Sequence, residues 1–286
     1  MSSDLNCSVH ALYLHPVKSC AGIAVDRGLL VDTGLDLDRA WMLVDEDDRF
    51  VTQRELPRLA LVKPTLRHDD LVLRAPGMLA LHLALDCVDS DSARQVHVWA
   101  DTVPAWDMGA LAAQWFSDFI GRPLRLMRFD PDYRRASDPR WTGEHSAQTA
   151  FADAFALLVT STASLVELNR RLALQGVPAV DMRRFRPNLV LDGIEAHDED
   201  HIDTLEIDTP QGEVALKLVK PCVRCTIPGV DPDRGVQGHE VTDALAAYRA
   251  DARMGGGVTF GMNAIVLRGA EHVLAVGQRC RANWAF

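Results

Sequence analysis

The sequence predicts an α+β protein that is rich in β-barrel structure and divided into two domains. Three observations predict this class: a length of 286 residues, short apolar runs at even spacing in the first half, and a segment of prolines and charges near residue 130. A chain of this length exceeds what one small core needs, and short strands at even spacing are typical of a barrel or a sandwich.

The first half carries most of the strand-like runs. The expected strands are residues 9–17, 41–44, 59–62, 71–73, 79–85 and 95–99. Within 79–85 leucine occupies every second position, and this period of two places one face of a strand on a core. Apolar residues then recur every four positions from Leu111 to Phe119, ahead of Gly121 and Pro123, which predicts one helix lying across the barrel.

A change of composition follows this helix. Residues 130–139 hold two prolines and many charges without any periodicity, which is typical of a connection between domains. We therefore expect one domain at 1–130 and a second at 131–286.

The second half mixes helices with strands. Ser161 and the hydroxyls up to Ser164 are suited to cap a helix whose apolar stripe includes Leu165 and Leu168. A second helix is expected at 242–250, and the expected strands are 155–159, 189–191, 204–208, 213–219, 258–267 and 273–276. The strand at 213–219 leads directly into Lys220, Pro221 and Cys222.

The charge balance excludes a general nucleic-acid binder, because 40 acidic residues against 30 basic ones give a net charge of −10. The acidic runs 45–48, 69–70 and 195–203 are interpreted as solvated turns and loops. Several basic residues instead stand beside proline or cysteine: Lys18, Arg183, Arg184, Arg186, Lys220 and Arg224. They indicate either a local anion site or scattered surface arginines.

The beginning of the chain lacks a secretory signal, and no stretch reaches the ~20 apolar residues of a membrane span, so we expect a cytoplasmic protein without a span. The six cysteines, at positions 7, 20, 87, 222, 225 and 280, are sparse and irregularly spaced. Free thiols or metal ligands are therefore expected rather than disulfides.

The pair Cys222 and Cys225 is the most specific local feature. Thiolates are soft metal ligands, and an arginine next to a cysteine favours the thiolate. A structural zinc site would need a second ligand pair, and thioredoxin-type chemistry would need a helix where residues 226–229 predict a turn. Two partly buried structural cysteines remain the alternative.

Other candidate features are weaker. His197 and His201 would form a metal pair on a helix, but their acidic surroundings favour an exposed loop. The glycines at 255–257 could offer backbone amides to an anion or form a flexible entry to a strand. No serine, histidine and acid arrangement supports a hydrolase.

Four segments taken together resemble the MOSC family, whose name stands for molybdenum-cofactor sulfurase C-terminal domain. They are Tyr13-Leu-His-Pro-Val-Lys-Ser-Cys-Ala-Gly22, Asp38-Arg-Ala-Trp41, Arg184-Phe-Arg-Pro-Asn188, and Pro221-Cys-Val-Arg-Cys225 with Val230-Asp-Pro-Asp233. The first half resembles the β-barrel domain that precedes MOSC in the amidoxime-reducing component. The resemblance thus implies an N-terminal MOSC β-barrel domain followed by a MOSC β-barrel domain with peripheral helices.

The resemblance implies a molybdenum cofactor, a molybdopterin bound between the two domains, with Cys225 as the metal ligand and catalytic residue. By the same resemblance the cofactor-binding residues are Lys18, Ser19, Arg39, Ser161, Arg186, Asn188, Val223, Arg224 and Cys225. Lysine, arginine forks and backbone amides suit an anionic cofactor. No pyridoxal phosphate is expected. Cys222 has no assigned role beyond packing, and Asp153 is a candidate polar group near the substrate pocket.

The implied function is an oxidoreductase that reduces small N-hydroxylated compounds, such as amidoximes, hydroxylamines and N-hydroxylated bases, by removing oxygen at molybdenum. A separate ferredoxin, flavodoxin or cytochrome would donate the electrons. The main alternative is a sulfur-transfer or molybdenum-cofactor carrier module that uses a persulfide on Cys225, and a binding module with a structural metal is a third. Asn263 replaces a tyrosine of the animal enzymes, which predicts a different pocket shape.

Overall fold

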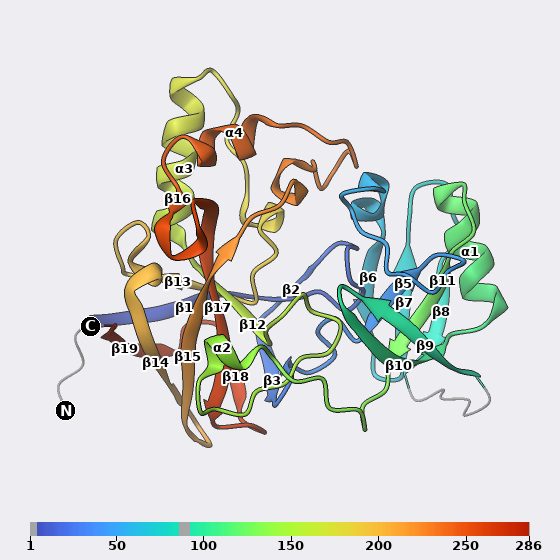
Figure 1. Cartoon of the computed structure of the whole chain (residues 1–286), viewed down its shortest axis with the longest axis horizontal. Helices are drawn as coiled ribbons and strands as arrows, with labels where there is room; N and C mark the ends of the chain where they lie inside the picture. The colour runs from blue at the N-terminus through green and yellow to red at the C-terminus, as the bar shows by residue number, and fades with distance from the viewer. Residues whose placement is uncertain (1–4, 86–91, 286) are drawn as a thin grey trace.

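A computed structural model describes residues 5–85 and 92–285, and Cys87 lies outside these ranges. Figure 1 shows a larger lobe beside a smaller one, both built mainly of strands. The predicted α+β class, rich in β-barrel structure, is confirmed. None of the helices in the described ranges is long and apolar enough to span a bilayer.

The larger lobe contains a closed barrel of seven strands. Its strands are β1 (Leu5–Leu14), β12 (Leu157–Ser161), β13 (Leu189–Asp192), β14 (Ile202–Thr209), β15 (Gly212–Val223), β17 (Gly257–Arg268) and β19 (Arg279–Trp284). They follow the order β12-β13-β1-β19-β14-β15-β17, and β17 pairs with β12 to close the ring. Closure leaves no open edge for another chain to pair with among these strands.

Smaller strands extend the larger lobe. β2 (Ile23–Val25) pairs with β1, β16 (Ala250–Asp251) pairs with β17, and β18 (Val273–Ala275), β3 (Arg27–Val31) and β4 (Gly34–Leu35) form a three-stranded sheet. Two of the strands within the first 35 residues, β1 and β3, therefore pair with strands from the second half of the chain. The strands at both ends of the chain lie side by side, because β1 pairs with β19.

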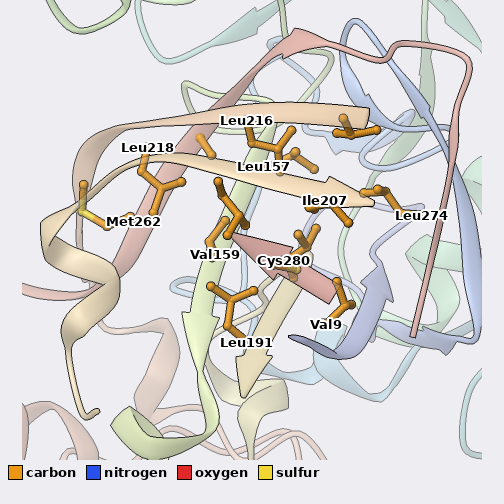
Figure 2. Close-up of a cluster of buried hydrophobic side chains, with 14 of the residues drawn as sticks. Val9, Leu157, Val159, Leu191, Ile207, Leu216, Leu218, Met262, Leu274 and Cys280 are labelled. Atoms are coloured by element: carbon orange, nitrogen blue, oxygen red, sulfur yellow. The ribbon is translucent and has the colours of Figure 1, made fainter. Parts of the chain in front are cut away.

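The barrel interior is a single apolar cluster. Alternate residues of β1 and β14, including Val9 and Ile207, point inward to meet Leu191, Leu216 and other buried side chains. Figure 2 shows this cluster between the strands. Burial of aliphatic side chains at about 25 cal/mol per Å² is the main stabilising term of such a core.

The smaller lobe contains two sheets and a helix. Its elements are β5 (Trp41–Val44), β11 (Arg125–Phe129), β10 (Asp101–Asp107), β9 (Ala93–Val98), β6 (Lys63–Leu66), β7 (Asp70–Arg74), β8 (Leu81–Ala84) and α1 (Ala110–Ile120). The predicted helix is confirmed as an element, and it buries Trp115 and Phe119. It packs beside β11, in a lobe whose described strands form two separate sheets rather than one closed barrel. The strand expected at 59–62 is wrong, because a 3-10 helix, η1 (Pro57–Leu61), begins with Pro57, which has no N–H to donate to a strand neighbour.

Helices cover one side of the barrel. They are α3 (Thr162–Leu174) and α4 (Glu240–Ala246), and a short helix, α2 (Pro139–Thr142), follows the segment between the lobes. The predicted cap of α3 is confirmed, since the Ser161 hydroxyl accepts a hydrogen bond of 3.1 Å from the backbone N–H of Ser164. Leu168 and Leu172 are fully buried against α4 and β13.

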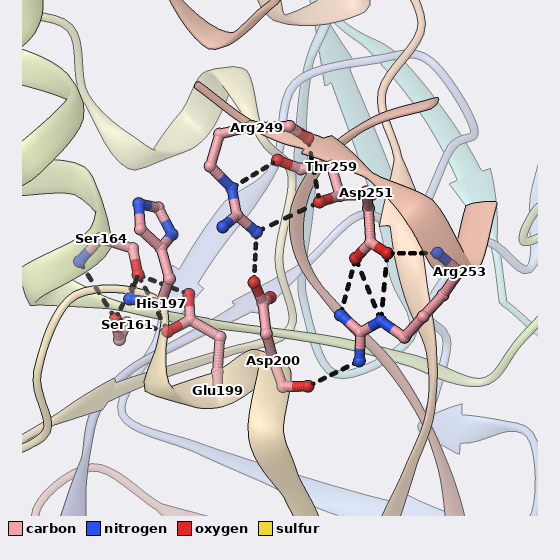
Figure 3. Close-up of polar contacts among 9 residues, drawn as sticks. All are labelled: Ser161, Ser164, His197, Glu199, Asp200, Arg249, Asp251, Arg253 and Thr259. Carbon is pink, nitrogen blue, oxygen red and sulfur yellow. Dashed lines mark hydrogen bonds and ion pairs between the residues drawn. The ribbon is translucent and has the colours of Figure 1, made fainter. Parts of the chain in front are cut away.

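The acidic segment 195–203 is not the solvated loop that its composition predicts. Glu199 is 0% exposed and accepts hydrogen bonds from the hydroxyls of Ser161 (2.9 Å) and Ser164 (2.6 Å), while Asp200 is paired with Arg249 (Figure 3). Burial raises the pKa of Glu199 to about 7 despite these bonds. The hydroxyls of the helix cap thus hold a buried carboxyl.

His197 adjoins the same cluster. Its ring packs against Tyr248 and Phe260, and burial together with Arg249 lowers its pKa to about 4. A histidine in this setting is neutral at pH 7. The residue is therefore part of the packing between α3, α4 and β17 rather than of the exposed loop that its acidic surroundings predict.

Gly261 tests the closure of the barrel. Its φ is +77°, and a Cβ added there would lie 2.6 Å from the carbonyl oxygen of Val159 on β12. We expect Gly261→Ala to lower the free energy of unfolding by about 1–3 kcal/mol more than Gly255→Ala does. Gly255 is the matched control, because its φ is +63° but a Cβ there meets nothing within 4 Å. Urea denaturation of both variants measures the difference. Equal losses of unfolding free energy would contradict this account of the contact between β12 and β17.

Glu199 predicts a pH dependence of stability. Because its pKa is raised in the folded protein to about 7, from an ordinary value of 4.5, its destabilising effect grows as the pH rises through this interval. The stability of the wild type should therefore fall relative to Glu199→Gln by about 3 kcal/mol between pH 4.5 and pH 8. Denaturant titrations across this range measure the difference, with Glu195→Gln as an exposed control. Parallel curves for wild type and Glu199→Gln would contradict it.

Candidate functional site

A pocket lies between the two lobes, where loops next to barrel strands meet loops of the smaller lobe. Ser19 follows β1, Thr52 belongs to the smaller lobe, and Asn188 precedes β13. The segment after β15 contributes Cys225, and β17 contributes Asn263. Residues that are far apart in the sequence therefore share one cavity of about 130 Å³.

The lining of this pocket is strongly cationic. Among the described residues that line it, one is acidic, Asp153, and five are cationic: Lys18, Arg39, Arg54, Arg186 and Arg224. Such an excess of positive charge within a chain of net charge −10 favours an anionic ligand. Of the basic residues that stand beside proline or cysteine in the sequence, Lys18, Arg186 and Arg224 line this pocket, whereas Arg183, Arg184 and Lys220 do not.

Lys18 and Asp153 form an ion pair across the pocket, between segments that are far apart in the sequence. It joins the one acidic residue among the described lining residues to a cation. The ammonium of Lys18 donates to the carboxylate of Asp153 (2.5 Å) and to the carbonyl of Phe151 (2.8 Å). Burial would raise the pKa of Asp153, but Lys18, the Trp99 indole and Arg54 lower it below its ordinary value. Asp153 is therefore ionised at neutral pH.

Arg39 connects the loop after β4 with the loop before β13. Its guanidinium donates to the carbonyl of Arg186 (2.9 Å) and to the side-chain oxygen of Asn188 (3.1 Å), and it is paired with Asp38. Asn188 is 1% exposed, and its oxygen also accepts from the backbone N–H of Leu158 (3.1 Å). The asparagine thus fixes Arg39 relative to two barrel strands.

The positive charge of Arg186 has fewer hydrogen-bond and ion-pair partners than that of Arg39. Its guanidinium donates to the carbonyl of Cys20 (2.5 Å), while burial and the nearby Arg39 lower its pKa to about 10. A lowered pKa in a cation means that the surroundings disfavour its charge. A bound anion at this point would remove that penalty.

The backbone of the pocket is strained at three of its lining residues. Ser19, Arg39 and Arg186 have φ values of 66°, 49° and 57°. Residues other than glycine rarely adopt positive φ, and such strain gathers at functional sites. In each case the neighbouring loop turns sharply beside the cavity.

The two cysteines of the pair differ in their surroundings. Arg224 donates to the sulfur of Cys222 (3.0 Å) and to the carbonyl of Phe185 (2.9 Å), whereas the thiol of Cys225 is free and its residue is exposed. The Nε atom of Arg224 is buried without a hydrogen-bond partner. This orphaned donor and the exposed thiol are the groups that a ligand in the pocket would satisfy.

The structure brings together most of the residues expected to bind the cofactor. Those that line the pocket are Lys18, Ser19, Arg39, Arg186, Asn188, Val223, Arg224 and Cys225. Ser161 does not line it, because its hydroxyl caps α3 and donates to Glu199. The five cysteines in the described ranges are free thiols, in line with the expectation of thiols rather than disulfides.

Sequence reasoning missed several residues of the site. Thr52 and Arg54 line the pocket, and Trp99 donates its indole N–H to Asp153 (3.3 Å). Arg135, within the predicted connection between domains, is buried and donates to the carbonyls of Ala150 (2.8 Å) and Ala152 (2.7 Å). An arginine between two prolines gives no local signal of such a role, because its partners become neighbours only in the fold.

No protein metal cage is present in the described part of the chain, where no three His, Cys, Asp or Glu side chains gather as a metal site. The donor set instead fits an anionic, metal-bearing cofactor that brings its own ligands. Cations and an orphaned guanidinium N–H suit its phosphate and ring oxygens, and the free thiol of Cys225 suits its metal.

Two family models match the chain. One is the MOSC N-terminal beta barrel domain, over residues 6–123, and the other is the MOSC domain, over residues 146–281. Residues 124–145 lie between the two matches and include the predicted boundary at 130.

Curated relatives match along most of the chain. The bovine (Bos taurus) mitochondrial amidoxime reducing component 2 is 36% identical over 250 residues, which cover 85% of this chain and 72% of the relative. The human (Homo sapiens) mitochondrial amidoxime-reducing component 1 is 34% identical, with the same two shares covered. The human molybdenum cofactor sulfurase is 29% identical over 88% of this chain, which spans 29% of that relative. Both domain matches and the relatives agree, and the chain belongs to the MOSC family, with a MOSC N-terminal beta barrel domain followed by a MOSC domain.

Proposed function

We propose that this protein is a molybdenum-cofactor-dependent oxidoreductase that reduces N-hydroxylated compounds, with amidoximes, hydroxylamines and N-hydroxylated bases as its substrate class. The observation that carries the proposal is the free, exposed thiol of Cys225 at a pocket lined by five cations. Similarity to relatives named amidoxime reducing components supports the reductive activity.

The cations and amides of the pocket would hold the cofactor. Arg39, Arg186 and Arg224 offer forked donors for phosphate and pterin oxygens, and the backbone around Ser19 and Val223 offers further contacts. Asn188 keeps Arg39 in place through its side-chain oxygen. Ser161 has no contact to offer here, so its role is the cap of α3 and the hydrogen bond to Glu199.

When bound, the molybdenum cofactor supplies a metal that exchanges an oxygen atom and two electrons with a substrate. Cys225 would be the single protein ligand of that metal. Asp153, ionised beside Lys18, would bind the N–H groups of an amidine-like end of the substrate and orient it toward the thiol side of the pocket. A separate ferredoxin, flavodoxin or cytochrome would supply the electrons.

A second candidate function rests on the similarity to molybdenum cofactor sulfurase. In this alternative Cys225, which is exposed and free, carries a persulfide or presents a maturing cofactor to another protein. Sulfur transfer needs an accessible thiol but no substrate pocket beside it. Reduction needs both, so the two functions predict different behaviour of the pocket variants.

Substitution of Cys225 tests the metal ligand. We expect Cys225→Ser, purified from a host that makes the cofactor, to lose most of its molybdenum, because the protein ligand of the metal is removed. Its rate of amidoxime reduction with an artificial electron donor should fall by at least about 90%. Cys222→Ser is the matched control, since a hydroxyl can still accept the bond from Arg224. Full molybdenum and activity in Cys225→Ser would overturn the assignment. Wild-type protein that carries a persulfide on Cys225 but neither molybdenum nor pterin would favour sulfur transfer.

Substitution of Arg186 tests the anion site. Because burial and Arg39 disfavour its charge, Arg186→Gln should raise the unfolding temperature of cofactor-free protein while it weakens pterin retention about 10-fold to 100-fold. Arg184→Gln is the control, because that guanidinium donates to the carbonyl of Val230 (3.0 Å) and lies outside this pocket. Pterin fluorescence after dialysis and a thermal melt measure both effects. Unchanged retention in Arg186→Gln would contradict the proposed cofactor contact.

A further inference from the structure

Two cysteines lie opposite each other on the first and last strands of the barrel. Cys7 on β1 and Cys280 on β19 are direct partners in the antiparallel register. Side chains of directly opposed residues project from the same face of a sheet. Both cysteines are free, and the Cys280 thiol donates a hydrogen bond to the carbonyl of Gln278 (3.7 Å).

The backbone geometry of this pair already suits a disulfide. Opposed residues of antiparallel strands have Cα atoms about 4.5–5.5 Å apart. Disulfides span Cα separations of about 4.4–6.8 Å, so the separation expected for this register lies within the range that a disulfide bridges. Neighbouring register pairs on both sides, Asn6 with Arg281 and Ser8 with Arg279, hold the two strands in place.

The pair is also accessible to a small oxidant. Cys7 is partly exposed, whereas Cys280 is 1% exposed and belongs to the barrel core, beside Val9 (Figure 2). Both line a surface cavity whose other residues include Asp192, Arg279 and Arg281. A peroxide that enters this cavity meets Cys7 first.

The two thiols differ in reactivity. The neighbouring Cys280 thiol lowers the pKa of Cys7 in spite of burial, while the nearby Cys7 and burial raise the pKa of Cys280. Thiolates rather than thiols are nucleophiles, so Cys7 is the attacking residue and Cys280 the resolving one. Cys20 offers a contrast, because burial raises its pKa to about 12 and it has no cysteine opposite it.

We propose that Cys7 and Cys280 form a redox-modification site at which a hydroperoxide converts two thiols into an intramolecular disulfide. The Cys7 thiolate attacks the O–O bond of hydrogen peroxide, which gives a sulfenic acid and hydroxide. The Cys280 thiol then attacks the sulfenic sulfur, so that the S–S bond forms and water leaves. In total the two thiols lose two electrons and two protons, and one peroxide becomes two waters.

This disulfide would covalently join β1 and β19, the first and last strands of the barrel, which already pair with each other. β1 (Leu5–Leu14) contains Cys7 and leads into Lys18 and Ser19, so the bond would stabilise the strand that precedes part of the pocket lining. The site is remote in sequence from Cys225, and the inference does not depend on the proposed function.

The experiment treats the full-length protein with hydrogen peroxide, blocks the remaining thiols by alkylation and analyses an unreduced digest by mass spectrometry. We expect a cross-linked peptide pair, joined through Cys7 and Cys280, about 2 Da lighter than its separate parts and released by dithiothreitol. The unfolding temperature should rise by roughly 5 °C on oxidation. The double variant Cys222→Ser with Cys225→Ser should give the same cross-link.

Two further variants keep the test decisive. Cys7→Ser should abolish the cross-link and the rise in unfolding temperature, and Cys280→Val, which preserves an apolar core residue, should leave Cys7 as a sulfenic or sulfinic acid. If Cys280 kept its thiol while wild-type Cys7 was over-oxidised or joined to another molecule, the proposal would be wrong. It would also be wrong if both thiols stayed reduced under conditions that oxidise Cys225.

Discussion

The gathering of like charges around one pocket is the constraint on which the rest of the site depends. Guanidinium and ammonium groups repel one another when they leave water, so each must be held by the fold. Asn188 holds one of these cations in place. Its side-chain oxygen accepts hydrogen bonds from Arg39 and from the N–H of Leu158, while its side-chain amide donates to the carbonyl of Tyr13 (3.3 Å). One buried side chain thereby connects β1, β12 and the loop before β13 to a cation from the other lobe.

The closed barrel explains how these loops stay in place. β12 pairs on one side with β13 and on the other with β17, so the loops next to these strands are anchored by the same core. The segment between the lobes contributes a further anchor through Arg135, which donates to the carbonyls of Ala150, Ala152 and Asp153. Arg135 does not line the pocket itself, so it positions the segment around Asp153 from outside the cavity.

The motifs made much of the site predictable. The segments around Lys18, Arg39, Arg186 and Cys225 lie far apart in the sequence, and the structure brings them to one cavity. Hydrophobic periodicity also predicted most strands and α1, because burial of one face leaves a local signal.

Long-range pairing left no such signal. The union of β1 with β13 and β19 depends on residues almost the whole chain apart, and the burial of Glu199 depends on hydroxyls from another element. Composition predicted a solvated acidic loop there, since an acid-rich run is usually exposed. The hydroxyl of Ser161, expected at the cofactor, is instead used twice within the protein, as helix cap and as donor to that carboxyl.

The electrostatic contrast between the pocket and the whole chain limits what the site can do. With a net charge of −10, the protein as a whole repels anions at distances where salt does not screen them, and the cations act mainly at short range. The anionic ligand that we propose would therefore be held by direct contacts with Arg39, Arg186 and Arg224 rather than attracted from afar. Such an arrangement suits a resident cofactor that is inserted once and kept, and it leaves the exposed thiol of Cys225 for the ligand's metal, because Arg224 already engages the sulfur of Cys222.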